Sequence, residues 1–174
     1  SCGAMSLINR TTEPWSIYVG IPAKKIAERS QKLLSKEQEL LKKLQAEIVV
    51  GAHREITKIV SDENVRQYAE VSGDFNSIHL DEEAAERSIF KKKISHGMLI
   101  ASYISAYLGN EFPGNGTIYM GENIRFLKPI YIGTMIRLEF TILDIDEKNN
   151  ATIKTDVYDQ NEEKAVDGVA YVKL

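Results

Sequence analysis

A buried helix is predicted by the stretch Met98-Leu99-Ile100-Ala101-Ser102-Tyr103-Ile104-Ser105-Ala106-Tyr107-Leu108. Its residues are apolar on nearly every side of the helix, and a helix that is hydrophobic all round is typically buried on all sides. The stretch begins directly after His96 and Gly97. We therefore expect one central helix, with the rest of a domain built around it.

Alternating apolar and polar residues dominate the sequence on both sides of this helix. The alternation covers residues 54–60, 118–126, 136–142, 153–157 and 166–172. Such alternation predicts half-buried strands, and Asn149-Asn150 and residues 159–163 predict turns. Strands joined by short turns favour an antiparallel sheet. One buried helix against one curled antiparallel sheet gives an α+β architecture.

A short polar segment precedes the helix and carries groups that can move protons. It reads Ser72-Gly73-Asp74-Phe75-Asn76-Ser77-Ile78-His79-Leu80-Asp81 and holds a carboxylate and an imidazole. Taken singly, Asp74 is more often a turn cap, His79 a structural histidine and Gly97 a packing glycine. Together they place an acid, a base and the unpaired N–H groups of a helix start in one region. These are the parts needed to add water to an activated double bond.

This polar segment resembles the signature of the MaoC-like dehydratases, and most closely that of the (R)-specific enoyl-CoA hydratases. The residues that carry the resemblance are 72–79 and His96-Gly97-Met98-Leu99. It extends from about Glu47 to Leu174 and includes residues 112–119 and 126–133. The resemblance implies the hot-dog fold, in which an antiparallel sheet wraps around a central buried helix. The family usually has proline at the position of Ser77, so this loop lacks a fixed φ angle there.

The resemblance also implies an activity: a hydratase or dehydratase that interconverts trans-2-enoyl and (R)-3-hydroxyacyl thioesters of CoA or acyl-carrier protein. Asp74 and His79 then hold one water between them as a coupled acid and base, and the sequence leaves open which is the base. The Gly97 N–H stabilises the thioester oxygen, and Asn76 and Ser105 orient the Asp74 loop. No metal or other cofactor is expected.

Two other functions stay open at this point: a hot-dog acyl thioesterase and a non-catalytic acyl-binding protein. The Asp-x-Asn-x-x-His spacing favours the hydratase over the thioesterase. The presence of Asp74, His79 and Gly97 together argues against a protein that only binds acyl groups. Ser105 also has a second interpretation, in which its hydroxyl bonds back to its own helix.

Residues 1–46 lie outside this resemblance, and we interpret them as an N-terminal extension to a hot-dog domain at 47–174. Residues 14–26 resemble the C-terminal end of hexapeptide-repeat acyltransferases, but the repeats and catalytic histidine of those enzymes are missing, so no acyltransferase activity is expected. Apolar residues recur at helical spacing from Ala23 to Ile48, which predicts an amphipathic helix. Ser1-Cys2-Gly3-Ala4 is interpreted as a cloning scar before Met5.

Composition limits the expected partners. The 174 residues carry a formal charge of -3, which gives no general attraction to nucleic acid or to an anionic membrane. Cys2 is the single cysteine, so an intramolecular disulfide is excluded. No apolar run approaches the roughly 20 residues of a membrane-spanning helix. We expect a cytoplasmic protein that forms a homodimer or a higher homo-oligomer, and the family resemblance implies that its sites lie at the subunit interface.

Overall fold

The computed structural model describes residues 16–19, 24–28, 32, 35, 36 and 48–174, and the chain divides into two units. The units are Ser1–Glu47 and Ile48–Leu174. Within the described residues, no helix is both long and apolar enough to cross a membrane.

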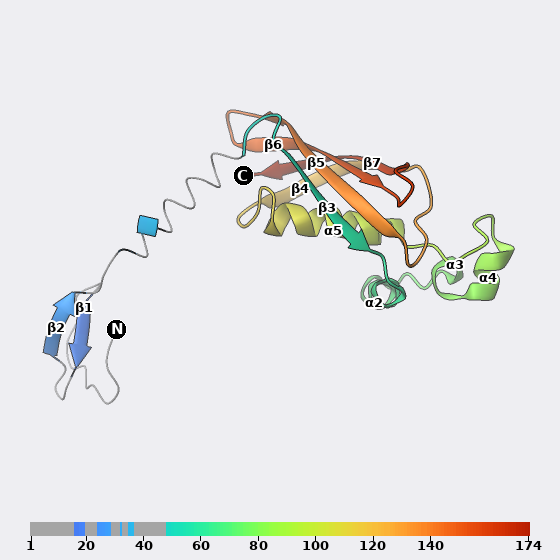
Figure 1. Ribbon diagram of the computed structural model, residues 1–174, viewed down its shortest axis with the longest axis horizontal. Coiled ribbons are helices and arrows are strands. Elements are labelled where there is room, and N and C mark those ends of the chain that lie inside the picture. The colour runs from blue at the N-terminus through green and yellow to red at the C-terminus, as the bar shows by residue number, and fades with distance from the viewer. Residues whose placement is uncertain (1–15, 20–23, 29–31, 33–34, 37–47) are drawn as a thin grey trace. The chain divides into compact units, whose positions relative to one another are not determined.

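The first unit contains a two-stranded antiparallel sheet, which corrects part of the predicted amphipathic helix. Strand β1 (Ser16–Val19) pairs with strand β2 (Lys24–Glu28), so residues 24–28 are extended rather than helical (Figure 1). Gly20 and Pro22 precede β2, and both residue types favour a chain reversal over a helix. Lys32, Ser35 and Lys36 are helical. The rest of the predicted helix up to Glu47 lies outside the described residues.

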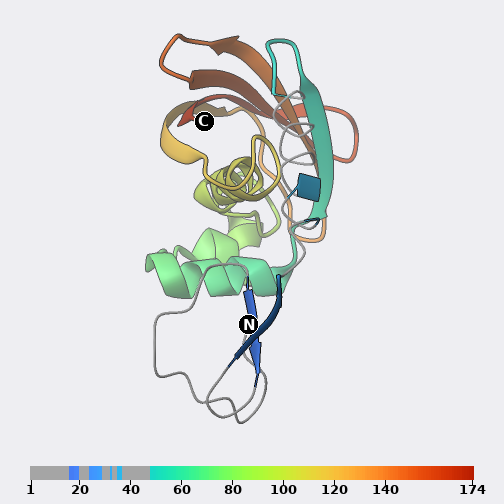
Figure 2. The ribbon, with the colours of Figure 1, turned by 90° about the vertical axis from the view of Figure 1, so that its left-hand side faces the viewer.

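The second unit contains a five-stranded antiparallel sheet with the strand order β3-β5-β6-β7-β4. Its strands are β3 (His53–Ile59), β4 (Ile118–Phe126), β5 (Met135–Ile145), β6 (Asn150–Tyr158) and β7 (Lys164–Lys173). Figure 2 shows the sheet curving over helix α5 (Gly97–Asn110), which is seen nearly end-on. This arrangement confirms the predicted α+β architecture, with a sheet wrapped around a central helix as in the hot-dog fold.

The core lies between the concave face of the sheet and α5. Along β5 every second residue is buried, and these residues are Ile136, Leu138, Phe140 and Ile142. On the helix, Ile100, Ile104 and Leu108 are at most 1% exposed and belong to the same apolar cluster. Burying one such side chain stabilises the fold by roughly 1.5–3 kcal/mol. The core therefore fixes the position of α5 and, with it, of Gly97 at the helix start.

One face of α5 is not covered, which corrects the prediction that the helix is buried on all sides. Met98, Ser102 and Ala106 follow one another at four-residue spacing and are exposed. The single sheet covers only one side of the helix, so the residues on the opposite side face solvent within one chain.

Three short helices connect β3 to α5 and carry the polar segment. They are α2 (Asp62–Ser72), α3 (Ser77–Leu80) and α4 (Glu82–Arg87). Ser61 caps α2 and Asp81 caps α4, as their sequence positions predict. Gly73 ends α2 with a φ of 77°, a left-handed conformation that glycine adopts without strain. This turn redirects the chain from α2 into the Asp74 loop.

Candidate active site

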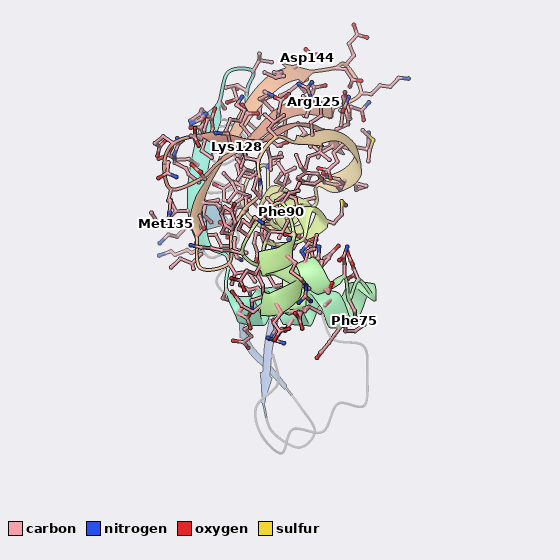
Figure 3. All side chains as sticks on the ribbon, turned by 90° about the vertical axis from the view of Figure 1, so that its right-hand side faces the viewer. Phe75, Phe90, Arg125, Lys128, Met135 and Asp144 are labelled. Carbon is pink, nitrogen blue, oxygen red and sulfur yellow. The ribbon has the colours of Figure 1, made fainter. Side chains whose placement is uncertain are left out.

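The Asp74 loop is ordered by hydrogen bonds from its own side chains. The backbone N–H of Asp74 donates to Ser72 Oγ at 3.2 Å, and the N–H of Asn76 donates to Asp74 Oδ1 at 3.2 Å. Asn76 in turn caps α3, because its Oδ1 accepts from the N–H of Ile78. Phe75 is 62% exposed and points away from the domain (Figure 3). The carboxylate of Asp74 is thus held at the start of the helix that carries His79.

His79 is 7% exposed, and its environment fixes which ring nitrogen is free. Its Nδ1 lies 2.8 Å from the carbonyl oxygen of Ile94. A carbonyl oxygen only accepts, so Nδ1 carries the proton, and Nε2 of the neutral ring keeps a lone pair. Desolvation by burial lowers the pKa of His79, and the nearby His96 acts in the same direction. The Ile94 carbonyl and the Asp74 carboxylate oppose this shift without reversing it.

His96 is a residue that we did not predict as part of the site. It precedes α5, is 2% exposed, and its ring lies against that of His79 with centroids 3.9 Å apart. Its Nε2 is 3.0 Å from the backbone carbonyl of Asp74, so Nε2–H donates to the Asp74 loop. The sequence signal for this role was its place next to Gly97 in the segment His96-Gly97-Met98-Leu99, which carries part of the family resemblance.

The three polar groups are close enough to share a small ligand. One ligand atom from each of Asp74, His79 and His96 lies within 4.8 Å of the others. Two hydrogen bonds of about 2.8 Å to one water span this distance. The same groups belong to the types that bind zinc. However, ring lone pairs lie in the ring planes, and two stacked rings tilted by 35° converge poorly on one ion. The geometry therefore favours a water molecule.

Gly97 is the first residue of α5, where the backbone N–H groups lack helical partners and the helix dipole is positive. A Cβ atom at this position would lie 2.8, 2.9 and 3.0 Å from ring atoms of Phe126. Glycine therefore lets the end of β4 pack directly onto the start of α5.

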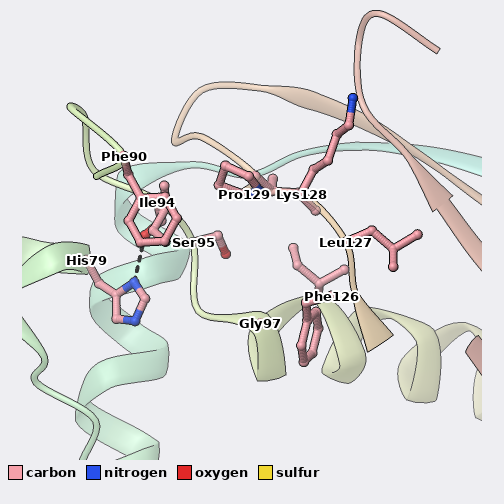
Figure 4. Close-up of a pocket in the computed structure, with 11 residues that line it drawn as sticks. His79, Phe90, Ile94, Ser95, Gly97, Phe126, Leu127, Lys128 and Pro129 are labelled. Carbon is pink, nitrogen blue, oxygen red and sulfur yellow. Dashed lines mark hydrogen bonds between the residues drawn. The ribbon is translucent and has the colours of Figure 1, made fainter. Parts of the chain in front are cut away.

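A cavity of about 290 Å³ connects His79 to Gly97. We call it the His79 hollow, and Figure 4 shows the side chains that line it. They are His79, Phe90, Ile94, Ser95, Gly97, Ile100, Phe126, Leu127, Lys128, Pro129 and Ile130. A mostly apolar hollow with a few polar groups is typical of a small-molecule site. It fits an acyl group whose polar end lies between the imidazole and the helix start.

The predicted site residues are only partly brought together. Asp74, Asn76 and His79 lie in one loop and helix, and His79 and Gly97 share the hollow. Ser105 is half-buried in α5, and no hydrogen bond to the Asp74 loop is found for it within residues 48–174. The walls formed by Phe90 and by residues 126–130 were not predicted as site residues.

Comparisons with known proteins are consistent with this geometry. A family model described as MaoC like domain matches residues 43–165. The (R)-specific enoyl-CoA hydratase of Aeromonas caviae is 36% identical over 126 residues, which cover 72% of this chain and 94% of that protein. The 3-hydroxybutyryl-CoA dehydratase of Methylorubrum extorquens is 33% identical over 129 residues, covering 74% and 82%.

A solved structure is similar as well. The structure of R-hydratase PhaJ1 from Pseudomonas aeruginosa in its unliganded form superposes with a TM-score of 0.70 at 38% identity. The superposition covers 73% of this chain and 82% of that one. The family match begins at residue 43, and none of these similarities supports the resemblance of residues 14–26 to acyltransferases.

Proposed function

The chain belongs to the family of proteins with a MaoC like domain, and from this we propose that Asp74, His79 and Gly97 form the catalytic centre of a hydratase. The protein is a lyase that hydrates enoyl thioesters and dehydrates 3-hydroxyacyl thioesters. We infer that the substrates are trans-2-enoyl and (R)-3-hydroxyacyl thioesters. One observation supports this assignment of residues. Ligand atoms of Asp74 and His79 lie within 4.8 Å of each other, beside the His79 hollow, which Gly97 also lines.

Asp74 and His79 act on one water molecule as a pair. In hydration, one of them takes a proton from the water as its oxygen bonds to C3 of the enoyl group. The other gives a proton to C2, so the pair holds the same number of protons before and after the reaction. Dehydration follows the same path in reverse. The fixed proton on His79 Nδ1 leaves Nε2 as the nitrogen that exchanges protons with the water.

The Gly97 N–H stabilises the charge that develops on the thioester oxygen during the attack. The N–H groups at the start of α5 have no helical partners, and removing one donor of this kind typically costs about 100- to 1,000-fold in turnover. His96 holds the Asp74 loop against the same helix start through its hydrogen bond to the Asp74 carbonyl. We keep Asn76 and Ser105 as proposed supporting residues.

We further infer that the enzyme is a homodimer that works in the cytoplasm. Strand β4 is an edge of the sheet, and on it Ile118 and Met120 are 60% and 53% exposed. An exposed apolar edge strand favours pairing with a second chain. The uncovered face of α5 includes Met98, whose exposed apolar side chain also favours burial against a second chain. The cytoplasmic location rests on the single cysteine, which fits a reducing compartment.

The test follows the absorbance of crotonyl-CoA together with free thiol and the chirality of the product. Loss of the enoyl signal without thiol release, with formation of the (R)-3-hydroxy product, is the expected result. Release of free thiol would instead indicate a thioesterase. Binding without any change in either signal would indicate a non-catalytic acyl-binding protein.

A further inference from the structure

The outer face of the sheet carries a histidine and two glutamates that meet across two neighbouring strands. His53 and Glu55 lie two residues apart on β3, and Glu139 lies on β5 directly opposite Glu55. We call these three residues the His53 cluster. The buried residues of β5, such as Leu138 and Phe140, alternate with Glu139, so Glu139 points away from α5. Figure 2 shows β3 at one edge of the curved sheet, with α5 on its concave side.

The three side chains of the His53 cluster are close enough to share one metal ion. One ligand atom of each lies within 4.8 Å of the others. Zinc bonds of about 2.0–2.2 Å place two tetrahedral ligands roughly 3.4 Å apart. Small rotations can close the difference, because the side chain of Glu55 is 59% exposed. The cluster has one imidazole, so the two stacked rings that converge poorly on an ion beside Asp74 have no counterpart here.

A threonine on β5 orients the imidazole of the cluster. Thr141 lies directly opposite His53, and its Oγ1 is 2.9 Å from His53 Nδ1. In the tautomer in which Nδ1–H donates to this hydroxyl oxygen, the lone pair of Nε2 is free for a metal ion. Histidines that bind metals typically donate their second N–H to such a partner, which fixes the ring and its tautomer. Thr141 is thus placed to support His53 as a ligand.

The cluster lies in a region with a surplus of negative charge. Arg137 Nη1 is 3.6 Å from Glu55 Oε2 and also contacts Glu139, while Nη2 contacts Glu162. One guanidinium is therefore shared among three carboxylates. Like charges directly opposite each other in a sheet are destabilising, and this is the relationship of Glu55 to Glu139. A divalent cation between these two carboxylates removes the repulsion and leaves Arg137 its bond to Glu162.

The neighbouring strands of the same face show the opposite balance. On β6 and β7, Lys154 pairs with Asp156 and Asp167, and Lys164 pairs with Asp156. Arg125 on β4 is a further partner of Asp167. In this network three cations are set against two carboxylates. The surplus of carboxylate on the outer face is therefore confined to the side of the sheet where β3 and β5 pair.

We propose that His53, Glu55 and Glu139 bind a divalent transition-metal ion of the zinc type, which links β3 to β5. The imidazole favours such an ion over Mg²⁺ and Ca²⁺, which take oxygen ligands. Strand β3 is an edge of the sheet and pairs only with β5, so the ion adds a second kind of link to this strand. Because β4 is the opposite edge, the His53 cluster stays accessible in a dimer that pairs through β4.

The first test titrates the full chain, freed of metal with EDTA, with Zn²⁺ in a calorimeter. We expect His53→Gln and Glu139→Gln each to lower the zinc affinity about tenfold or more, since losing an outer partner of a ligand already costs about 10- to 100-fold. Glu147→Gln, an exposed carboxylate between β5 and β6, is the matched control and should bind as the wild type does. Unchanged affinity in either of the first two variants, or no binding by the wild type, would overturn the inference.

The hydroxyl of Thr141 provides a finer comparison in the same titration. Thr141→Val keeps the shape of the side chain but removes the partner of His53 Nδ1, so it should weaken zinc binding about tenfold. Thr141→Ser keeps the hydroxyl and should recover most of the affinity. Ca²⁺ at the same concentration should not displace the zinc. Displacement by Ca²⁺ would reduce the cluster to a group of carboxylates that attracts any divalent cation, and would overturn the inference.

The second test identifies the ligand and its effect on the fold. The chain has three histidines, so the ring nitrogen signals in NMR can be assigned with single variants. Zinc should shift the signals of His53, and a shift confined to His79 or His96 would overturn the inference. Saturating zinc should also raise the Tm of the wild type, because a ligand of the folded state stabilises it. The same rise in His53→Gln would show that the ion binds elsewhere in the chain.

Discussion

The imidazole rings of His79 and His96 lie with their centroids 3.9 Å apart, and each ring donates one N–H to a backbone carbonyl. His79 donates to Ile94, which precedes α5, and His96 donates to Asp74, which precedes α3. The two bonds run in opposite directions between the same pair of segments. They therefore hold the Asp74 loop, α3 and the start of α5 together as one unit, and a change in either ring affects the whole site.

Removing either member of the acid–base pair should abolish most of the activity. We expect Asp74→Asn and His79→Ala each to lower kcat for crotonyl-CoA hydration about a hundredfold or more, the scale for a lost general acid or base. The double variant should be no slower than the slower single variant, because the two groups act as a unit. Lys148→Gln, at an exposed position that does not line the His79 hollow, is the control. Near-normal turnover in either single variant would remove that residue from the mechanism.

The pH dependence of stability should report the burial of His79. Its pKa in the folded chain lies below the ordinary value of 6.5, so the unfolded chain takes up the proton first as the pH falls. Its contribution to stability is therefore complete above pH 6.5 and is lost as the pH falls through the folded pKa. Thermal unfolding should show a smaller loss of Tm on acidification in His79→Asn, which cannot titrate. Parallel curves for wild type and variant would contradict this account.

A methyl group at position 97 should interfere with the substrate rather than with the fold. Phe126 is 47% exposed and lines the His79 hollow, so its ring can be displaced into the hollow when Gly97→Ala adds a Cβ. We expect kcat/KM to fall about tenfold or more, since a donor for the thioester oxygen is also disturbed. The double variant Gly97→Ala/Phe126→Leu should regain part of the loss. Full activity in Gly97→Ala would exclude the proposed role of this helix start.

His96 should act as a positioning residue. In His96→Ala the Asp74 loop loses its hydrogen bond to the start of α5, and we expect kcat to fall about tenfold or more with little change in KM. His96→Gln keeps an N–H donor and should recover part of kcat. Because His96 lowers the pKa of His79, its removal should also move the acid limb of the kcat/KM profile to higher pH. Two results together would show that His96 only packs in the core: an acid limb of the kcat/KM profile that does not move, and equal losses of kcat in His96→Ala and His96→Gln.

The oligomer should depend on the edge strand β4. We expect light scattering at micromolar concentration to show a dimer for the wild type and a monomer for Met120→Lys, since charge on an exposed edge opposes strand pairing. Val71→Lys, at an 89% exposed position on α2, should leave the dimer intact. A fully active wild-type monomer would contradict the proposed site at a subunit interface.

The sequence was sufficient to predict the sheet and the central helix, because β5, β6 and β7 bury residues at mostly alternating positions and α5 is rich in apolar residues. Alternation along β5 follows the burial of every second residue from Ile136 to Ile142. The caps at Ser61 and Asp81 could also be predicted, since a capping residue acts within one turn of its helix. These features are set by local patterns, and local patterns can be read from one sequence.

The features that the sequence did not predict depend on contacts between distant residues. The bond from His96 to Asp74 joins residues 22 positions apart, and the contact of Phe126 with Gly97 depends on how β4 packs against α5. The exposed face of α5 could not be anticipated, because composition does not say which sides of a helix a single sheet covers. In the first unit, the pairing of β1 with β2 prevailed over the helical spacing of the residues after Ala23.

The place of β7 within the sheet sets the earliest point during synthesis at which the His79 hollow can form. Strand β7 lies between β6 and β4, and the carbonyl of Ala165 accepts from the N–H groups of Leu127 and Lys128, which begin the wall of the His79 hollow. Asp74, His79 and Gly97 are translated long before these contacts can form. A nascent chain on the ribosome therefore carries every proposed catalytic group and yet lacks a shaped site until residues 164–173 have left the exit tunnel.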